Sequence, residues 1–295
     1  PLEGAASTGA AAPTLAFTFA LGAPTPPPPD LVPLVEYYYV SGFRRGALLH
    51  FRTAEGGWLE LDAPAGTARG VLPEALLAGP PWPLRDLFNA ALTSYLRARG
   101  GYVLHGAALH RPEGGLLVVG SAMAGKTTLS LNLVRRGWRW IADDKIVLRD
   151  AGPGAPCAAG LLAQANIDPD LARWFPELAG LAGRPPVFPH TTKRAVRLAE
   201  LVDAGAEADA TPRGTTPRWL LFPRVEDLGG SRVEPLKQEE AFLELVRQSP
   251  LVNDRAAGRA QLGLLGRLTR HARAWRLVAA RDLLADPERL AVLAR

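Results

Sequence analysis

The sequence predicts an α/β fold preceded by a β-rich portion. Two observations predict it. Around position 120 an apolar run, a glycine-rich loop, a helix-length segment and a second apolar run follow one another within about thirty residues, which is the spacing of a strand–helix–strand unit. Before position 84, short apolar stretches are separated by turns rich in Gly and Pro, which is typical of strands. With 47% hydrophobic and 21% charged residues, the composition is that of a globular protein.

The β-rich portion spans residues 14–83 and follows a tail, residues 1–13, whose Ala, Gly, Ser, Thr and Pro composition predicts poor order. Four consecutive prolines in Pro24–Pro29 require an extended connection or turn. No site chemistry stands out in this portion, so we expect a structural or substrate-docking module. The expected strands are Thr14–Leu21, Val35–Val40, Ala47–Thr53 and Trp58–Ala63.

Residues 84–295 are predicted to form one further domain, which opens with a helix from Leu84 to Leu96 that ends at Gly100-Gly101. The expected strands are Tyr102–Leu109, Leu116–Val119, Trp138–Ala142, Lys145–Leu148, Trp219–Phe222 and Trp275–Val278. The expected helices are 126–136 (amphipathic and closed by Gly137), Leu171–Leu181, Glu239–Gln248, Ala256–Leu268 and one from Pro287.

Charge and composition exclude several classes of protein. The 34 Lys+Arg residues exceed the 29 Asp+Glu residues by five, but the basic residues are dispersed, so we expect no nucleic-acid partner. No apolar run reaches the roughly 18–20 residues of a spanning helix, so we expect no membrane insertion. The single cysteine, Cys157, excludes an internal disulfide and fits a reducing compartment, which predicts the cytoplasm. The oligomeric state is left open.

Residues 120–127 match the Walker A pattern G-x-x-x-x-G-K-[ST]. Backbone N–H groups of such a loop surround phosphate oxygens, the lysine binds the β- and γ-phosphates, and the following hydroxyl binds Mg²⁺. An apolar run leads into the loop and a helical segment leads out, which is the context that the motif requires. We therefore expect ATP and Mg²⁺ to bind here. The residues are Gly120, Ser121, Ala122, Met123, Ala124, Gly125, Lys126 and Thr127, with Thr128 as an additional candidate.

Met123 occupies a position where many such loops carry glycine, which eases unusual backbone torsions. It is also the one methionine of the chain. Either the loop tolerates a side chain here, or turnover is lower than with glycine.

Asp143-Asp144 follow a predicted strand, where carboxylates can hold Mg²⁺ or accept a proton from an attacking hydroxyl. The structural alternative is a pair of turn residues that cap the next element. His105 lies inside a predicted apolar strand, where a histidine is either a core residue or, beside a phosphate-binding loop, part of the site.

Taken together, the His105-Gly106 strand, the Walker A loop, the Arg136-Gly137 helix end and Ala142-Asp143-Asp144 resemble the catalytic domain of the HPr kinase/phosphorylase family. The resemblance is strong over about residues 100–150, weaker to about 290 and absent before 84. It implies a P-loop kinase core, shared with phosphoenolpyruvate carboxykinases.

The resemblance also implies roles for individual residues. Lys126 would bind phosphates and Thr127 the Mg²⁺. Asp143 would be the general base, oriented or charge-tuned by His105, and Asp144 would assist the metal. Lys193 and Arg194 would lie near the phosphates.

Two departures separate the chain from true HPr kinases: the Gly-rich signature after the core is missing, and the first 83 residues do not resemble the N-terminal domain of that family. The acceptor therefore need not be HPr. The leading hypothesis is a Mg²⁺-ATP-dependent kinase that phosphorylates a hydroxyl, foremost a serine of a protein or peptide. The alternatives are a nucleotide-dependent switch without transfer, and a small-molecule enzyme of the same fold.

Overall fold

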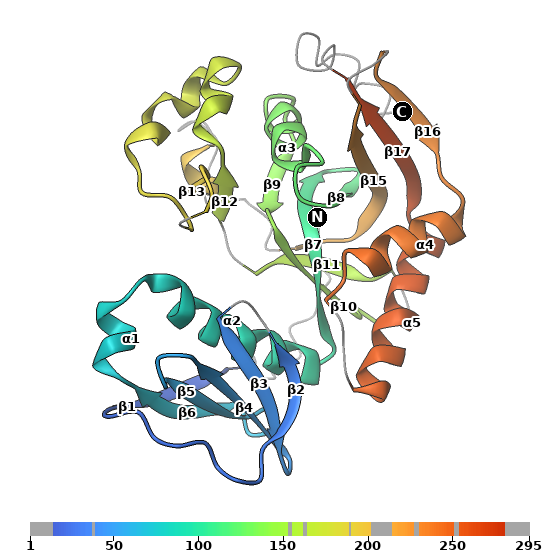
Figure 1. Cartoon of the computed structure of the whole chain (residues 1–295). Coiled ribbons are helices and arrows are strands. Elements are labelled where there is room, and N and C mark those ends of the chain that lie inside the picture. The colour runs from blue at the N-terminus through green and yellow to red at the C-terminus, as the bar shows by residue number, and fades with distance from the viewer. Residues whose placement is uncertain are drawn as a thin grey trace. The chain divides into compact units, whose positions relative to one another are not determined.

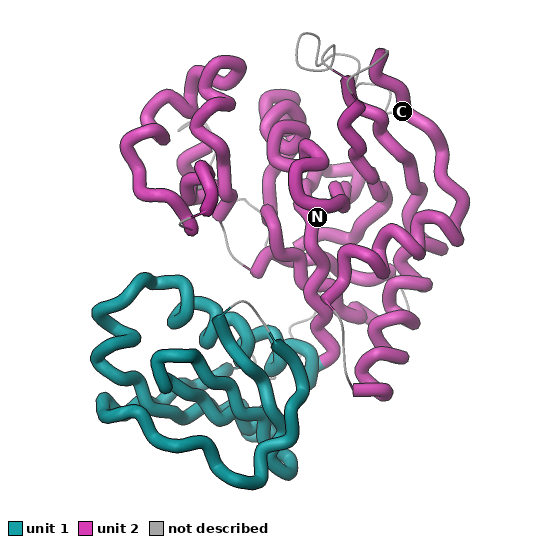
Figure 2. Tube along the Cα trace, viewed as in Figure 1, with its two compact units in different colours: residues 1–99 teal, residues 100–295 magenta. Residues whose placement is uncertain are grey.

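The computed structural model describes residues 14–36, 39–152, 155–161, 164–188, 190–201, 214–226, 230–250 and 254–280. The predicted tail, 1–13, and the helix predicted from Pro287 lie outside these ranges. The chain divides into two compact units, residues 1–99 and 100–295, which Figure 2 distinguishes by colour. None of the described helices is long and apolar enough to cross a membrane.

The described part of unit 1 is a six-stranded sheet with the strand order β1-β6-β5-β4-β3-β2. Helix α2 (Pro81–Ala98) packs on one face of it, where Leu87, Ala91 and Tyr95 meet Phe51 and Leu59 in a buried cluster. The strands are β1 (Ala16–Leu21), β2 (Val32–Glu36), β3 (Val40–Arg45), β4 (Leu48–Thr53), β5 (Trp58–Asp62) and β6 (Thr67–Leu72), followed by the short helix α1 (Glu74–Ala78).

Unit 1 corrects the sequence analysis at two points. The range Val35–Val40, predicted as one strand, contains the end of β2 and the start of β3, and β6 was not predicted. The helix predicted from Leu84 exists, but its apolar stripe packs on the sheet of unit 1, so the units divide after Arg99 and not at position 83. Periodicity identifies an apolar stripe without saying which sheet it covers.

Unit 2 is built on a large mixed sheet, in which the described strands follow the order β14-β11-β10-β7-β8-β15-β17-β16, with β9 also paired to β7 (Figure 1). Its strands are β7 (Gly101–Arg111), β8 (Gly114–Val119), β9 (Arg139–Ala142), β10 (Lys145–Arg149), β11 (Cys157–Gly160), β14 (Gly214–Thr215), β15 (Pro217–Val225), β16 (Arg232–Pro235) and β17 (Arg273–Ala279). A separate ribbon pairs β12 (Gln164–Ile167) with β13 (Arg194–Arg197).

The predicted strand–helix–strand unit is β8, α3 (Lys126–Val134) and β9. Strand β7 pairs antiparallel with both β8 and β9, so these two strands run in the same direction with β7 between them. The loop before α3 and the residues after β9 therefore emerge at the same end of the sheet, which is where an α/β sheet positions ligands.

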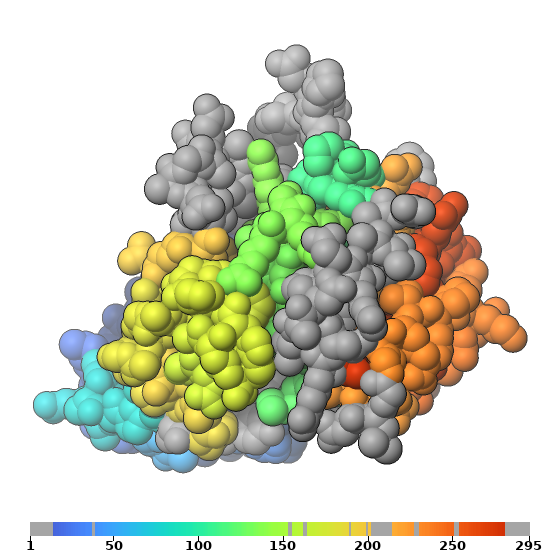
Figure 3. All heavy atoms as spheres, turned by 90° about the horizontal axis from the view of Figure 1, so that it is seen from above, coloured from blue at the N-terminus to red at the C-terminus, as the bar shows by residue number. Residues whose placement is uncertain are grey.

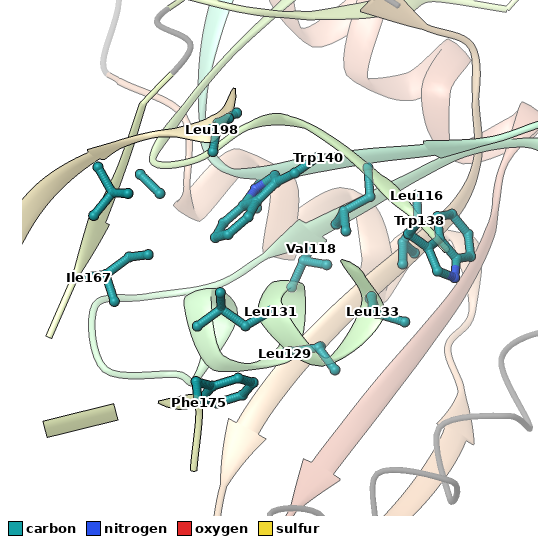
Figure 4. Packing of buried hydrophobic residues seen from close by; sticks show 14 of the residues in the cluster. Leu116, Val118, Leu129, Leu131, Leu133, Trp138, Trp140, Ile167, Phe175 and Leu198 are labelled. Carbon is teal, nitrogen blue, oxygen red and sulfur yellow. The ribbon is translucent and has the colours of Figure 1, made fainter. Parts of the chain in front are cut away.

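Strand β8 is buried on both faces, as its continuous apolar run predicts. Leu116 and Val118 belong to a cluster with the leucines of α3 and Phe175, which Figure 4 shows around that helix. Leu117 and Val119 belong to a second cluster, formed with helices α4 (Gln238–Arg247) and α5 (Arg255–His271). The sheet is therefore the middle of three layers.

The other elements predicted within the described residues of unit 2 are present, with two corrections. Helix α3 ends at Val134 and is not amphipathic, since Ser130 and Asn132 are buried along with its leucines. The range Leu171–Leu181 is not one α-helix but parts of two 3₁₀ helices, η1 (Pro169–Arg173) and η2 (Pro176–Gly183). Pro176 cannot donate a backbone hydrogen bond, which interrupts a helix at that residue.

Candidate functional site

The Walker A loop connects β8 to α3, and the N-cap of α3 is Gly125 in the left-handed conformation, with φ of 86°. No side chain caps this helix. The first N–H groups of a helix have no partner within the helix, and the positive end of the helix dipole favours anions. The N-terminus of α3 is therefore chemically suited to phosphate.

Met123 also adopts a left-handed conformation, with φ of 65°, and the residue is 86% exposed. The loop thus accommodates a side chain at this position by directing it into solvent. The backbone retains a torsion that glycine adopts at lower cost.

Lys126 is a buried cation at the start of α3, 8% exposed. Its Nζ donates to the carbonyl oxygens of Gly120 and Ser121 at 2.8 and 2.9 Å, and it lies 2.9 Å from Nε2 of His105. Burial lowers the pKa of Lys126, while the carboxylates of Asp144 and Asp143 act in the opposite direction. The ammonium is therefore held inside the loop by oxygen and nitrogen acceptors.

His105 lies on β7 and connects Lys126 to Asp144. Its Nδ1 lies 3.1 Å from both the backbone oxygen and Oδ1 of Asp144. Because Nε2 accepts from Lys126, Nδ1 must carry the ring proton and donate it to Asp144. The family resemblance implied that His105 acts on Asp143, whereas these contacts pair it with Asp144.

Asp144 follows β9 with φ of 67°, and the hydrogen bond from His105 is the main cause that lowers its pKa. Its carboxylate is ionised and 44% exposed. Thr127 and Asp144 line the same cleft, so an alcohol oxygen and a carboxylate are available for Mg²⁺, which prefers oxygen ligands and is commonly shared with substrate phosphates.

Asp143 is 6% exposed, and burial raises its pKa to about 6. The charge of Asp144 acts in the same direction, while the backbone N–H of Asn166 and the ammonium groups of Lys193 and Lys126 oppose it. A carboxyl group whose pKa lies near neutral pH can take up and release a proton during a reaction.

These groups line one cleft of about 340 Å³. Of the predicted site residues, it brings together His105, Ala122, Met123, Ala124, Gly125, Lys126, Thr127, Thr128, Asp143, Asp144 and Lys193. Gly120 and Ser121 contribute carbonyl oxygens to Lys126 and are not part of the lining. Arg194 is not part of it either, and its Nη1 donates to the carbonyl of Thr192.

Apart from Lys193, the opposite wall was not predicted. It is formed by Asn166 of β12, Leu171 and neighbouring residues of η1, and Lys193 beside β13; Figures 1 and 3 show this segment beside α3. The unpredicted residues are Asn166, Asp168, Asp170, Leu171 and Arg173. The alternation of polar and apolar residues in Gln164–Asp168 was a signal for a half-buried strand.

The chain matches no protein-family model and no curated protein. Its structure is similar to that of the Hpr(Ser) kinase/phosphatase from Coxiella burnetii, at 15% sequence identity, over 65% of this chain and 95% of that chain, with a TM-score of 0.34. A likeness at this identity and TM-score is too distant to assign an activity, so the chemistry must be inferred from the cleft itself.

Proposed function

We propose that this chain is a Mg²⁺-ATP-dependent kinase that transfers the γ-phosphate to a hydroxyl, foremost a serine of a protein or peptide. One observation carries the proposal: the carboxyl group of Asp143, buried and with a pKa of about 6, lines the same cleft as the Walker A loop. A site that only binds nucleotide needs a carboxylate for the metal, but it does not need a second carboxyl group that exchanges a proton.

The loop 120–127 and Thr128 would bind the phosphates of ATP. The uncapped N-terminus of α3 supplies backbone donors, and Lys126 supplies a positive charge. Lys193, on the opposite wall, adds a second cation. Mg²⁺, held by Thr127 and Asp144, would neutralise charge on the phosphates.

In the reaction, Asp143 takes the proton of the acceptor hydroxyl. The acceptor oxygen forms a bond to the γ-phosphorus, and the bond from this phosphorus to the β–γ bridging oxygen breaks, with its electron pair leaving on ADP. The ionised form of Asp143 is the one that acts, and its pKa of about 6 makes that form available at neutral pH.

His105 would act on two other groups of the site. As a neutral ring it accepts from Lys126 and donates to Asp144, so it orients the phosphate-binding cation and the metal-binding carboxylate together. This makes His105 a positioning residue, because it contacts Lys126 and Asp144 and not the base.

Incubation with γ-labelled ATP and Mg²⁺, together with a protein and peptide pool from a lysate, tests the proposal. We expect label on a protein or peptide, and its loss in Asp143→Asn, which leaves nucleotide binding nearly intact. Lys126→Ala should weaken both. Glu239→Gln, a carboxylate-to-amide change at an exposed position of α4, is the matched control and should retain transfer.

Two other outcomes separate the alternatives. Nucleotide binding without any transferred label contradicts a protein kinase and leaves the switch. Label that appears on a small molecule once metabolites are added to the pool identifies a small-molecule kinase.

Transfer by Asp143→Asn at the wild-type rate shows that the general base is assigned wrongly.

A further inference from the structure

The β12–β13 ribbon presents a polar face to the cleft, opposite the Walker A loop. Side chains alternate along β12: Ala165 and Ile167 are buried in the core, while Gln164 and Asn166 are partly exposed on the other side. Asn166 lines the cleft together with Lys126 and Asp143. The ribbon therefore positions an amide side chain across the cleft from the phosphate-binding residues.

Two hydrogen bonds fix Asn166. Its backbone N–H donates to Oδ2 of Asp143 at 3.3 Å, and its side-chain Oδ1 accepts from Nε2 of Gln164 at 3.2 Å. The second bond determines which end of the amide remains available. The Nδ2 group, with two hydrogens, has no hydrogen-bond partner among the described residues.

Asp168, one of the two carboxylates described on this wall, is already bound within the protein. Oδ1 of Asp168 accepts from the backbone N–H of Asp170 at 3.0 Å, and Oδ2 accepts from the hydroxyl of Thr192 at 2.5 Å. Asn166 therefore offers a neutral side-chain donor, while its backbone N–H is hydrogen-bonded directly to the proposed base.

We propose that the side-chain amide of Asn166 binds the reacting oxygen of the acceptor and selects a hydroxyl over an amine. This inference rests on the kinase function proposed above. A hydroxyl oxygen has one proton and two lone pairs. Its proton goes to Asp143, one lone pair attacks the γ-phosphorus as the bond to the bridging oxygen of ADP breaks, and the other lone pair accepts from Nδ2 of Asn166. A neutral amine has a single lone pair, which cannot attack phosphorus and accept from Asn166 at once.

The test uses the full chain with Mg²⁺-ATP and water as the hydroxyl acceptor, measuring phosphate release, alongside the binding of a fluorescent ADP analogue. We expect Asn166→Ala to lower the turnover about 10- to 100-fold. The dissociation constant of the ADP analogue should change by less than about twofold, because Asn166 is not among the groups proposed to bind the phosphates. Asn89→Ala, on α2 of unit 1, is the matched control and should have the wild-type turnover.

The pH profile separates a role in contact with the acceptor from a structural role. Asn166→Ala keeps the backbone N–H on Asp143, so the pH at which turnover is half-maximal should not move. Asn166→Asp adds a like charge beside Asp143, which should shift that pH upward. Gln164→Ala removes the hydrogen-bond partner of the Asn166 amide but leaves the amide itself in place. We therefore expect turnover to fall about three- to tenfold, less than in Asn166→Ala.

Wild-type turnover in Asn166→Ala overturns the inference, and so does a parallel tenfold loss of nucleotide affinity, which would assign Asn166 to the nucleotide. If the alanine variant does not fold, Asn166→Leu, which keeps the volume of the side chain, gives the same test. A wild-type chain that binds the ADP analogue but transfers phosphate to neither water nor any pool component overturns the kinase function and this inference with it. An active wild type with an equally active Asn166→Ala overturns the inference alone.

Discussion

The ammonium nitrogen of Lys126 lies 2.9 Å from Nε2 of His105, and the other ring nitrogen of His105 contacts Asp144. One imidazole thus connects the residue proposed to bind phosphate with the residue proposed to bind Mg²⁺. The two ring nitrogens have opposite roles, acceptor and donor, so this arrangement requires the neutral ring.

Replacing His105 with alanine removes an acceptor from Lys126 and a donor from Asp144. We expect the KM for ATP to rise about three- to tenfold and turnover to fall about 10- to 100-fold, with nucleotide binding retained. Steady-state kinetics with a fixed acceptor measure both. The surface variant His190→Ala is the control. Unchanged kinetics in His105→Ala would return this histidine to a purely structural role.

The rate of transfer should depend on pH through Asp143. Since its ionised form accepts the proton and its pKa is about 6, activity should rise as pH increases through about 6 and level off above 7. A pH–rate profile at saturating ATP measures this. A profile that is flat between pH 5 and 8 would contradict a base with this pKa.

Asp143→Asn should stabilise the fold at neutral pH. Burial raises the pKa of Asp143 from 3.8 to about 6. The contribution of this carboxyl group to the free energy of unfolding is therefore fully present below pH 3.8 and is lost as pH rises through 6. A neutral amide avoids that loss, so we expect the free energy of unfolding at pH 7 to increase by about 1–3 kcal/mol. Denaturant unfolding at pH 7 and pH 4 measures it, and the gain should shrink at pH 4. A destabilised variant at pH 7 would mean that the hydrogen bond from Asn166 and the nearby ammonium groups stabilise the carboxylate by more than burial destabilises it.

Substitutions at Met123 test how much the left-handed conformation of the loop costs in stability. Glycine adopts a φ of 65° without steric cost but loses more backbone entropy on folding, so Met123→Gly should change the free energy of unfolding by less than about 1 kcal/mol. A β-branched residue fits this conformation poorly, and Met123→Val should destabilise the fold by about 1–2 kcal/mol. Thermal unfolding measures both. If valine is as well tolerated as glycine, the loop relaxes to another conformation.

Sequence patterns were most informative where chemistry and burial coincide. Strand β8 and the glycine-rich loop after it could be predicted because a strand buried on both faces is continuously apolar and glycine favours turns; that this loop binds phosphate stays a prediction. The placement of Asp143 and Asp144 in the cleft could be predicted for a similar reason, since they directly follow a short apolar strand; the roles assigned to them stay a prediction.

The opposite wall could not be predicted in the same way. Asn166 lies 23 positions from Asp143 in the sequence, and its place beside Asp143 depends on a backbone hydrogen bond that no local pattern encodes. Asp143 was implied as the partner of His105, and the structure differs for a related reason: adjacent carboxylates are indistinguishable in sequence, and only the fold brings the ring to Asp144.

The backbone torsion at Asp144 restricts what position 144 can be. Consecutive side chains of an extended strand point to opposite faces, whereas the left-handed backbone at Asp144 allows both carboxyl groups to line one cleft. Glycine or asparagine would keep the backbone conformation but lose the negative charge. Glutamate would keep the charge, but its longer side chain fits the left-handed backbone less readily than a short polar side chain does. Aspartate meets both demands, so two adjacent carboxylates can take the two different roles proposed for them.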